Sequence, residues 1–158
     1  MNPWLVELER IDWTAYECLC GVSGHVGRDL QQIILAQSVA EMRGASLDGH
    51  VEDNSVVADV AAPAVGVIMA ALQENLASNV RNKLMVTLVR VVVGEASEDV
   101  SAAIHEHVRD GLWTIYGEAT RGATEIAIDI LECVEHDQAR LEYFRNALQP
   151  RLEKRRKQ

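Results

Sequence analysis

The chain has 158 residues, of which 48% are hydrophobic and 25% charged, and its formal net charge is −9. This size and apolar content predict one folded domain with its own core and exclude wholesale disorder. Residues 1–150 carry 10 of the 15 bases and 23 of the 24 acids, a net charge of −13 that argues against binding nucleic acid. The last eight residues hold five bases, and we expect them to form a solvated helix end whose cations suit the helix dipole.

Helical segments are expected along most of the chain, beginning near Pro3, a residue type favoured in the first helical turn. An irregular connection follows through "IDWTAYECLCG". A long helical region is expected from about Val26 to Arg43, with Val39 and Met42 on its inner face. The polar segment "GASLDGHVEDNS" comes next, with at most a broken turn of helix. Further helices fit residues 59–76, 79–93, 99–117, 119–136 and 137–155, and the short connections near 77, 118 and 137 predict antiparallel neighbours.

The segment "NKLMVTLVRVVVG" (82–94) is rich in Val, Leu and Thr, so its periodicity fits a buried strand as well as a buried helix. A shift of 40 residues decides between them. It brings Arg81 onto Arg121 and this segment onto "RGATEIAIDILEC", in which Glu125 and Asp129 lie at helical spacing. We find no alternating strand pattern and no hairpin signal. The chain is therefore expected to be all-α.

The forty-residue register, the Ala-Pro-Ala-Val start of "AAPAVGVIMAALQE" (61–74) and the Arg81/Arg121 pair resemble the HEAT-like (armadillo-type) α-helical repeat proteins of bacteria. The resemblance implies a short α-solenoid of antiparallel helix pairs with about 40 residues per repeat. It implies one HEAT-like helical domain over 1–158, in which 1–25 form an N-terminal cap and connection, 26–149 the repeats and 150–158 a basic helical tail. Such proteins usually bind other macromolecules, although a fold does not fix a function.

Candidates for chemistry are few. His105 and His107 lie two residues apart on an expected helix and so diverge, whereas a metallohydrolase helix needs histidines four apart. Cys18 and Cys20 lack the two or more intervening residues of a zinc knuckle, and we expect Cys133 to face the core. The glycine-rich "GVSGHVG" lacks the Lys-Ser/Thr ending of a phosphate loop. We predict no catalytic residue, no metal site and no cofactor, and leave the role of Cys18 and Cys20 open.

The odd cysteine count without a disulfide framework predicts a reducing compartment. The acidic N-terminus "MNPWLVELERID" lacks the features of a signal peptide, and no apolar run is long enough to span a bilayer. We therefore expect a cytoplasmic protein without membrane contact.

In an up-down stack of helices every second loop lies on the same edge, so the loops near 45–58, 94–98 and 136–138 are expected together. These loops are acidic, contain no Lys or Arg, and also carry His50 and His136. The nine residues predicted to bind a partner there are Asp48, Glu52, Asp53, Asp59, Glu95, Glu98, Asp99, Glu135 and Asp137. A simpler interpretation, polar loops in an acidic chain, carries equal weight.

These features predict a non-catalytic protein–protein interaction module. We expect a bacterial immunity or inhibitor-type protein that occludes a basic partner, such as a toxin domain, by imitating the phosphates a nuclease reads. The first alternative is a structural or regulatory scaffold subunit of a larger assembly or homo-oligomer. The second, a HEAT-like DNA-repair-type enzyme, is disfavoured by the acidic charge. The sequence leaves open whether the acidic edge or the concave face binds the partner.

Overall fold

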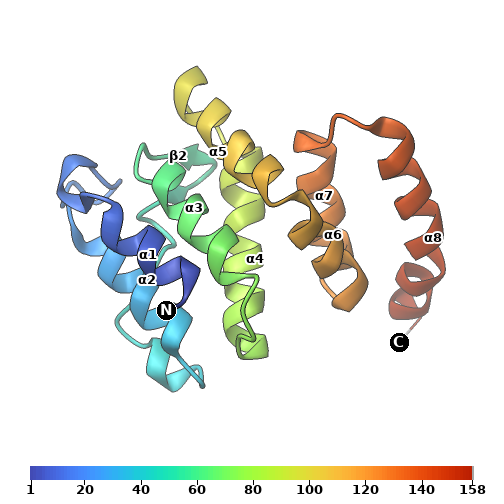
Figure 1. The fold of residues 1–158 in the computed structure, drawn as a ribbon, viewed down its shortest axis with the longest axis horizontal. Helices are drawn as coiled ribbons and strands as arrows, with labels where there is room; N and C mark the ends of the chain where they lie inside the picture. Colours follow the sequence, from blue (N-terminus) through green and yellow to red (C-terminus); the bar gives the residue numbers. More distant parts are fainter. Residues whose placement is uncertain (158) are drawn as a thin grey trace.

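The computed structural model describes residues 1–157, with Arg151 and Arg155 described by their backbone alone. The described chain is mainly helical, with two short 3-10 turns and one small hairpin (Figure 1). Its elements are α1 (Pro3–Arg10), η1 (Trp13–Ala15), α2 (His25–Leu35), η2 (Ala40–Met42), β1 (Glu52–Asp53), β2 (Val56–Val57), α3 (Ala61–Ala71), α4 (Ser78–Val93), α5 (Glu98–Asp110), α6 (Leu112–Arg121), α7 (Thr124–Val134) and α8 (Gln138–Arg156). None of the described helices combines the length and apolarity needed to cross a bilayer.

Each helix packs against specific neighbours. Helix α3 lies between α1 and α5, while α4 packs beside α7, and α7 in turn contacts α6 and α8. In Figure 1, α3 and α4 run in opposite directions, as do α7 and α8. The all-helical class expected from the sequence is confirmed by this arrangement.

The Val- and Thr-rich segment is helical, as the forty-residue shift predicted. It forms most of α4, where Leu84, Met85 and Leu88 are completely buried. The same 40-residue shift aligns Ile68 of α3 with Val108 of α5 in the sequence. Both side chains are buried in the core. Close packing of such aliphatic side chains supplies the main stabilisation of a helical domain.

The long helix expected from Val26 to Arg43 is wrong beyond Leu35. The backbone of Ala36 leaves the helical region, with φ −65° and ψ 138°. The side-chain amide of Gln32 then donates to the carbonyls of Glu41 and Arg43 at 3.0 and 2.8 Å, folding the segment back over α2. Because the chain has left the helix, Val39 is 68% exposed instead of facing the core.

The helix boundaries expected near residue 118 are also wrong. The single helix predicted over 99–117 is divided at Gly111 into α5 and α6. Helix α6 continues to Arg121 and ends at Gly122, whose φ of 144° suits glycine alone. Helix α7 therefore begins at Thr124, and Cys133 near its end is exposed, not in the core.

A small hairpin, β1–β2, was not expected from the sequence. Its two turn residues, Asn54 and Ser55, have φ of 47° and 70°, the positive pair that a two-residue hairpin turn requires. The backbone N–H of Val57 donates to the Glu95 carbonyl at 2.9 Å, and the N–H of Glu95 donates to the Ser55 carbonyl at 2.6 Å. The hairpin is thereby joined to the loop that follows α4.

Candidate metal centre and acidic edge

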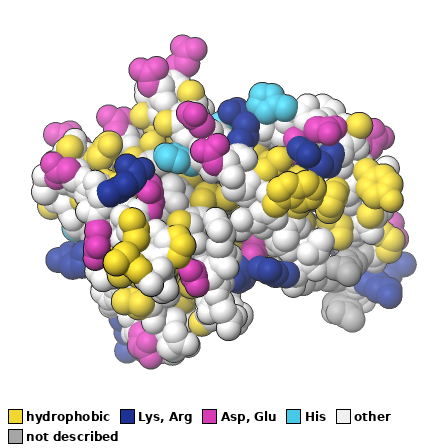
Figure 2. Space-filling model, in the orientation of Figure 1, with side chains coloured by type: hydrophobic (Ala, Val, Ile, Leu, Met, Phe, Trp, Pro, Cys, Tyr) yellow, Lys and Arg dark blue, Asp and Glu magenta, His cyan; other side chains and the backbone are white. Residues whose placement is uncertain are grey.

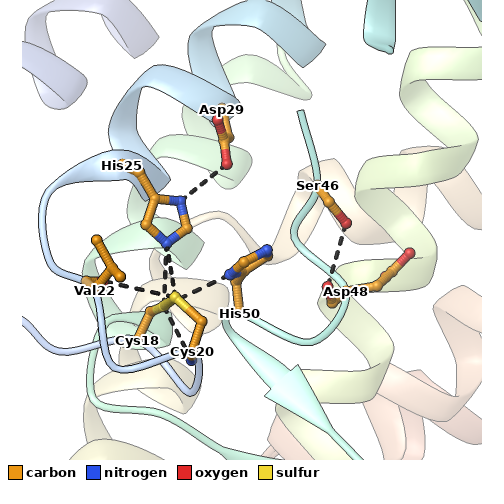
Figure 3. The surroundings of a disulfide bond; sticks show 8 residues. All are labelled: Cys18, Cys20, Val22, His25, Asp29, Ser46, Asp48 and His50. Atoms are coloured by element: carbon orange, nitrogen blue, oxygen red, sulfur yellow. Dashed lines mark hydrogen bonds and ion pairs between the residues drawn. A yellow bond between two sulfur atoms is a disulfide. The ribbon is translucent and has the colours of Figure 1, made fainter. Parts of the chain in front are cut away.

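Four side chains of metal-ligand type converge where the connection before α2 meets the loop before β1 (Figure 3). They are Cys18, Cys20, His25 and His50, and one ligand atom from each lies within 4.8 Å of the others. The His25 Nε2 atom is 3.1 Å from Cys18 Sγ and 3.3 Å from Cys20 Sγ. The His50 Nδ1 atom is 3.6 Å from Cys18 Sγ. Two segments far apart in sequence thus aim nitrogen atoms at one pair of sulfurs.

Backbone geometry brings these segments together. Gly24 adopts a left-handed conformation with φ 87° as the N-cap of α2, so the chain turns back and His25 begins the helix beside the cysteines. The N–H of Leu19 donates to the His50 carbonyl at 3.0 Å, which fixes the second segment against the first. The two imidazole rings pack edge to face with their centroids 4.6 Å apart.

Asp29 holds the His25 ring in place. It lies one helical turn along α2 and is only 5% exposed, and its Oδ2 atom is 3.0 Å from His25 Nδ1. In the tautomer that donates from Nδ1 to this carboxylate, Nε2 carries the lone pair and faces the sulfurs. A carboxylate on the remote nitrogen is the usual partner of a metal-ligating histidine.

In this structure the two sulfurs are joined as a disulfide, with 5.4 Å between the Cα atoms of Cys18 and Cys20. Cys18 is buried, Cys20 is exposed, and the N–H of Cys20 lies 3.2 Å from Cys18 Sγ. Because only one residue separates the cysteines, both sulfurs lie on the same side of a tight turn. The arrangement can act as a disulfide when oxidised and as a chelating pair of thiolates when reduced.

This cluster was not expected from the sequence, because the Cys18/Cys20 pair taken alone lacks zinc-knuckle spacing. The available signal was wider, a Cys-x-Cys pair with His25 five residues beyond it. From the sequence, His50 was expected only to lie on the acidic loops. Its approach to the sulfurs depends on the fold of residues 36–51, of which 36–43 were expected to be helical.

Five of the nine residues predicted to bind a partner are exposed acids on the joined loops and the start of α5. They are Asp53, Asp59, Glu95, Glu98 and Asp99, and within residues 1–157 none of them is in an ion pair. Figure 2 shows acidic side chains along the upper edge of the molecule, over the first turn of α5. We refer to these five residues as the acidic edge.

The other four are engaged by neighbouring groups. Asp48 pairs with Lys83 at 2.9 Å and Arg90 at 3.2 Å, two bases that α4 supplies. Glu52 is half-buried and accepts the Ser55 N–H at 2.8 Å. These contacts reduce the charge that the hairpin loop presents to a partner.

Glu135 and Asp137 serve the structure of the C-terminal helices. Glu135 is 6% exposed and accepts hydrogen bonds from the Tyr116 hydroxyl at 2.6 Å and from the Arg140 guanidinium at 2.8 and 2.9 Å. These bonds, that from Arg140 foremost, lower the pKa of Glu135 to about 2 against the opposing effect of burial. Asp137 accepts the Arg140 N–H at 3.0 Å in the first turn of α8. Glu135 is therefore not available to a partner.

Comparisons of the chain with protein-family models, with curated proteins and with solved structures find no match. The functional conclusions below therefore rest on the residues of this chain alone.

Proposed function

We propose that the chain is a non-catalytic protein-binding module, a short HEAT-like α-solenoid whose acidic edge docks a basic partner protein. The observation that carries the proposal is the joining of two distant loops, 45–58 and 94–98, by backbone hydrogen bonds between Ser55, Val57 and Glu95. This junction brings together the loops that carry Asp53, Asp59 and Glu95, and Glu98 and Asp99 follow directly in the first turn of α5.

The charge of that surface supports a cationic partner. Neighbouring carboxylates without cations repel one another, and docking a basic surface relieves that repulsion. The net negative charge of residues 1–150 also attracts a basic protein over a long range, which accelerates association at low salt. An immunity or inhibitor-type protein fits this description, because carboxylates at a surface can occupy the basic groove of a nuclease toxin in place of phosphates.

Affinity capture from the source organism tests the proposal with three baits, each checked by circular dichroism to be folded. The first is wild type, and the second neutralises the acidic edge by Asp53→Asn, Asp59→Asn, Glu95→Gln, Glu98→Gln and Asp99→Asn. The third is a charge-matched control that neutralises exposed acids outside the edge, namely Glu9, Glu106, Asp110, Glu142 and Glu153. We expect a basic partner on the wild-type and control baits and at least tenfold less on the edge variant. Equal capture by all three baits would contradict the proposal.

A specific observation favours a second candidate, a scaffold or self-associating subunit. Trp113 on α6 is 64% exposed and Tyr143 on α8 is 75% exposed. Figure 2 shows hydrophobic side chains gathered over these two helices. If this surface forms the interface, sedimentation should detect a dimer that persists in high salt and is lost in Trp113→Ala.

A further inference from the structure

We propose that the reduced chain binds one zinc ion, with Cys18 Sγ, Cys20 Sγ, His25 Nε2 and His50 Nδ1 as its four ligands. The site lies outside the acidic edge, and the proposal does not depend on the partner. Two thiolates and two imidazoles form a common ligand set for structural zinc.

The recorded distances fit tetrahedral coordination. Zinc–sulfur bonds of about 2.3 Å and zinc–nitrogen bonds of about 2.0 Å place tetrahedral ligand atoms about 3.3–3.8 Å from one another. His25 Nε2 lies 3.1 and 3.3 Å from the two sulfurs and His50 Nδ1 lies 3.6 Å from Cys18 Sγ, while the remaining pair, His50 and Cys20, is within 4.8 Å. Binding therefore requires little movement of the histidines, and the main change is separation of the two sulfurs after reduction.

The orientation of the imidazoles is better explained by a metal than by the disulfide. In the neutral tautomer that donates from Nδ1 to the buried Asp29, the lone pair lies on Nε2, 3.1 and 3.3 Å from the two sulfurs. Disulfide sulfurs carry no proton to donate, and this nitrogen would face only their lone pairs. A cation at the centre of the cluster would accept the Nε2 lone pair of this His25 tautomer, and His50 Nδ1 lies close enough to be a further ligand.

The electron and proton balance is simple. Two equivalents of a small-molecule thiol reduce the disulfide, giving two cysteine thiols and the disulfide of the reductant. Zinc then displaces the two thiol protons, and two zinc–sulfur bonds form. The resulting centre, one divalent cation with two thiolates and two neutral imidazoles, has no net charge and suits a partly buried position.

The ion would connect three segments: the turn at Cys18–Cys20, the start of α2 and the loop containing His50. That loop leads within two residues to Glu52 of β1, so the ion would also restrain the hairpin beneath the acidic edge. Four protein ligands fill a tetrahedral shell and leave no position for substrate, so the proposed role is structural.

The test is a cobalt titration of the chelator-stripped chain under reducing conditions. Tetrahedral cobalt with thiolate ligands gives intense visible d–d bands and a thiolate charge-transfer band. We expect saturation at one equivalent and displacement of cobalt by one equivalent of zinc. Cys20→Ser and His50→Gln should each weaken binding at least tenfold, while Asp29→Asn should weaken it about 10–100-fold.

Cys133→Ser and His107→Gln are matched controls that should bind as wild type does. Because Cys20 is exposed, Cys20→Ser is expected to retain the apo fold, and far-ultraviolet circular dichroism verifies this. Zinc should also raise the Tm of the reduced wild type and leave that of Cys20→Ser unchanged. Absence of the tetrahedral spectrum in reduced wild type, or undiminished affinity in folded Cys20→Ser and His50→Gln, would overturn the proposal.

Discussion

Arg81 of α4 and Glu118 of α6, 37 residues apart in sequence, form an ion pair in which the carboxylate is only 1% exposed. The same guanidinium donates to the carbonyls of Leu72 at 3.1 Å and Glu74 at 2.5 Å, just beyond α3. Arg121 approaches the same carboxylate at 3.3 Å. The Arg81 guanidinium thus ties α4 to the end of α3, while the buried Glu118 carboxylate engages both arginines of the forty-residue register.

Removing that buried charge should destabilise the fold strongly. Glu118→Gln leaves the Arg81 guanidinium partly buried without its counter-charge, and breaking such a pair costs about 3 kcal/mol of unfolding free energy. Glu132→Gln is the matched control, since its pair with Arg145 is exposed and should change stability by less than about 1 kcal/mol. Urea denaturation measures both variants, and similar losses would show that the buried pair has no special role.

Acid should destabilise the protein through Glu135. Its pKa is lowered from 4.5 to about 2 in the folded state, mainly by Arg140. The resulting stabilisation is present above pH 4.5 and is lost as the pH falls toward 2, amounting to as much as about 3 kcal/mol. Glu135→Gln should flatten this part of the pH profile, whereas Glu132→Gln should leave it intact. An unchanged acid limb in Glu135→Gln would contradict the assignment.

The same cluster predicts a second loss of stability, at alkaline pH. Burial first, and the hydrogen bond to Glu135 second, raise the pKa of Tyr116 to about 12. The stabilisation linked to the protonated phenol is present below pH 10 and lost as the pH rises toward 12. Spectrophotometric titration should show one late tyrosine in wild type that is missing in Tyr116→Phe.

Two helical glycines should respond oppositely to alanine. A Cβ at Gly27 would lie 2.6 Å from the indole of Trp13, whose Nε1 donates to the Leu8 carbonyl at 2.9 Å, so the ring has little freedom to move. Gly27→Ala should cost about 1–3 kcal/mol. At Gly117 nothing lies within 4 Å, and Gly117→Ala should stabilise by about 0.5–1 kcal/mol. Thermal denaturation measures the sign of the stability change in both variants. A stabilised Gly27→Ala would contradict the close packing of Gly27 against Trp13.

Neutralising different carboxylates of the acidic edge should change the free energy of unfolding in opposite directions. Glu98 and Asp99 occupy the first turn of α5, where the helix dipole favours them, so Glu98→Gln and Asp99→Asn should each cost about 0.3–1 kcal/mol at low salt. Asp53→Asn and Glu95→Gln relieve repulsion without such a loss and should be neutral or slightly stabilising. Denaturation at low and high salt distinguishes these effects, because salt screens both. Equal effects at all four positions would rule out the helix-dipole contribution.

The sequence predicted the helical class because its long apolar segments carry their own periodicity, and the shift by 40 residues assigned even the Val-rich α4 correctly. Its errors came where one residue redirects the chain. Gly111 and Gly122 set the true ends of α6, and Gln32 folds residues 36–43 back by donating to the carbonyls of Glu41 and Arg43. Helical periodicity does not encode such side-chain bonds.

The sites were predictable to different degrees. Exposed acids in loops are visible as composition, so the five residues of the acidic edge could be named, while Glu135 could not be separated from them without its contact to Arg140. The four-residue Cys–His cluster could not be predicted from the sequence because His50 meets Cys18 across 32 residues. A search for any histidine near the Cys-x-Cys pair would have found His25 alone.

The two proposals meet at the loop between His50 and Asp53, which the zinc ion would anchor and whose far end belongs to the acidic edge. The most direct test of the account is the zinc content of the chain isolated under reducing conditions without chelator, measured by native mass spectrometry. We expect one zinc ion per chain in wild type and in Cys133→Ser, and none in Cys20→Ser. A reduced wild-type chain that remains metal-free after incubation with excess zinc would contradict it.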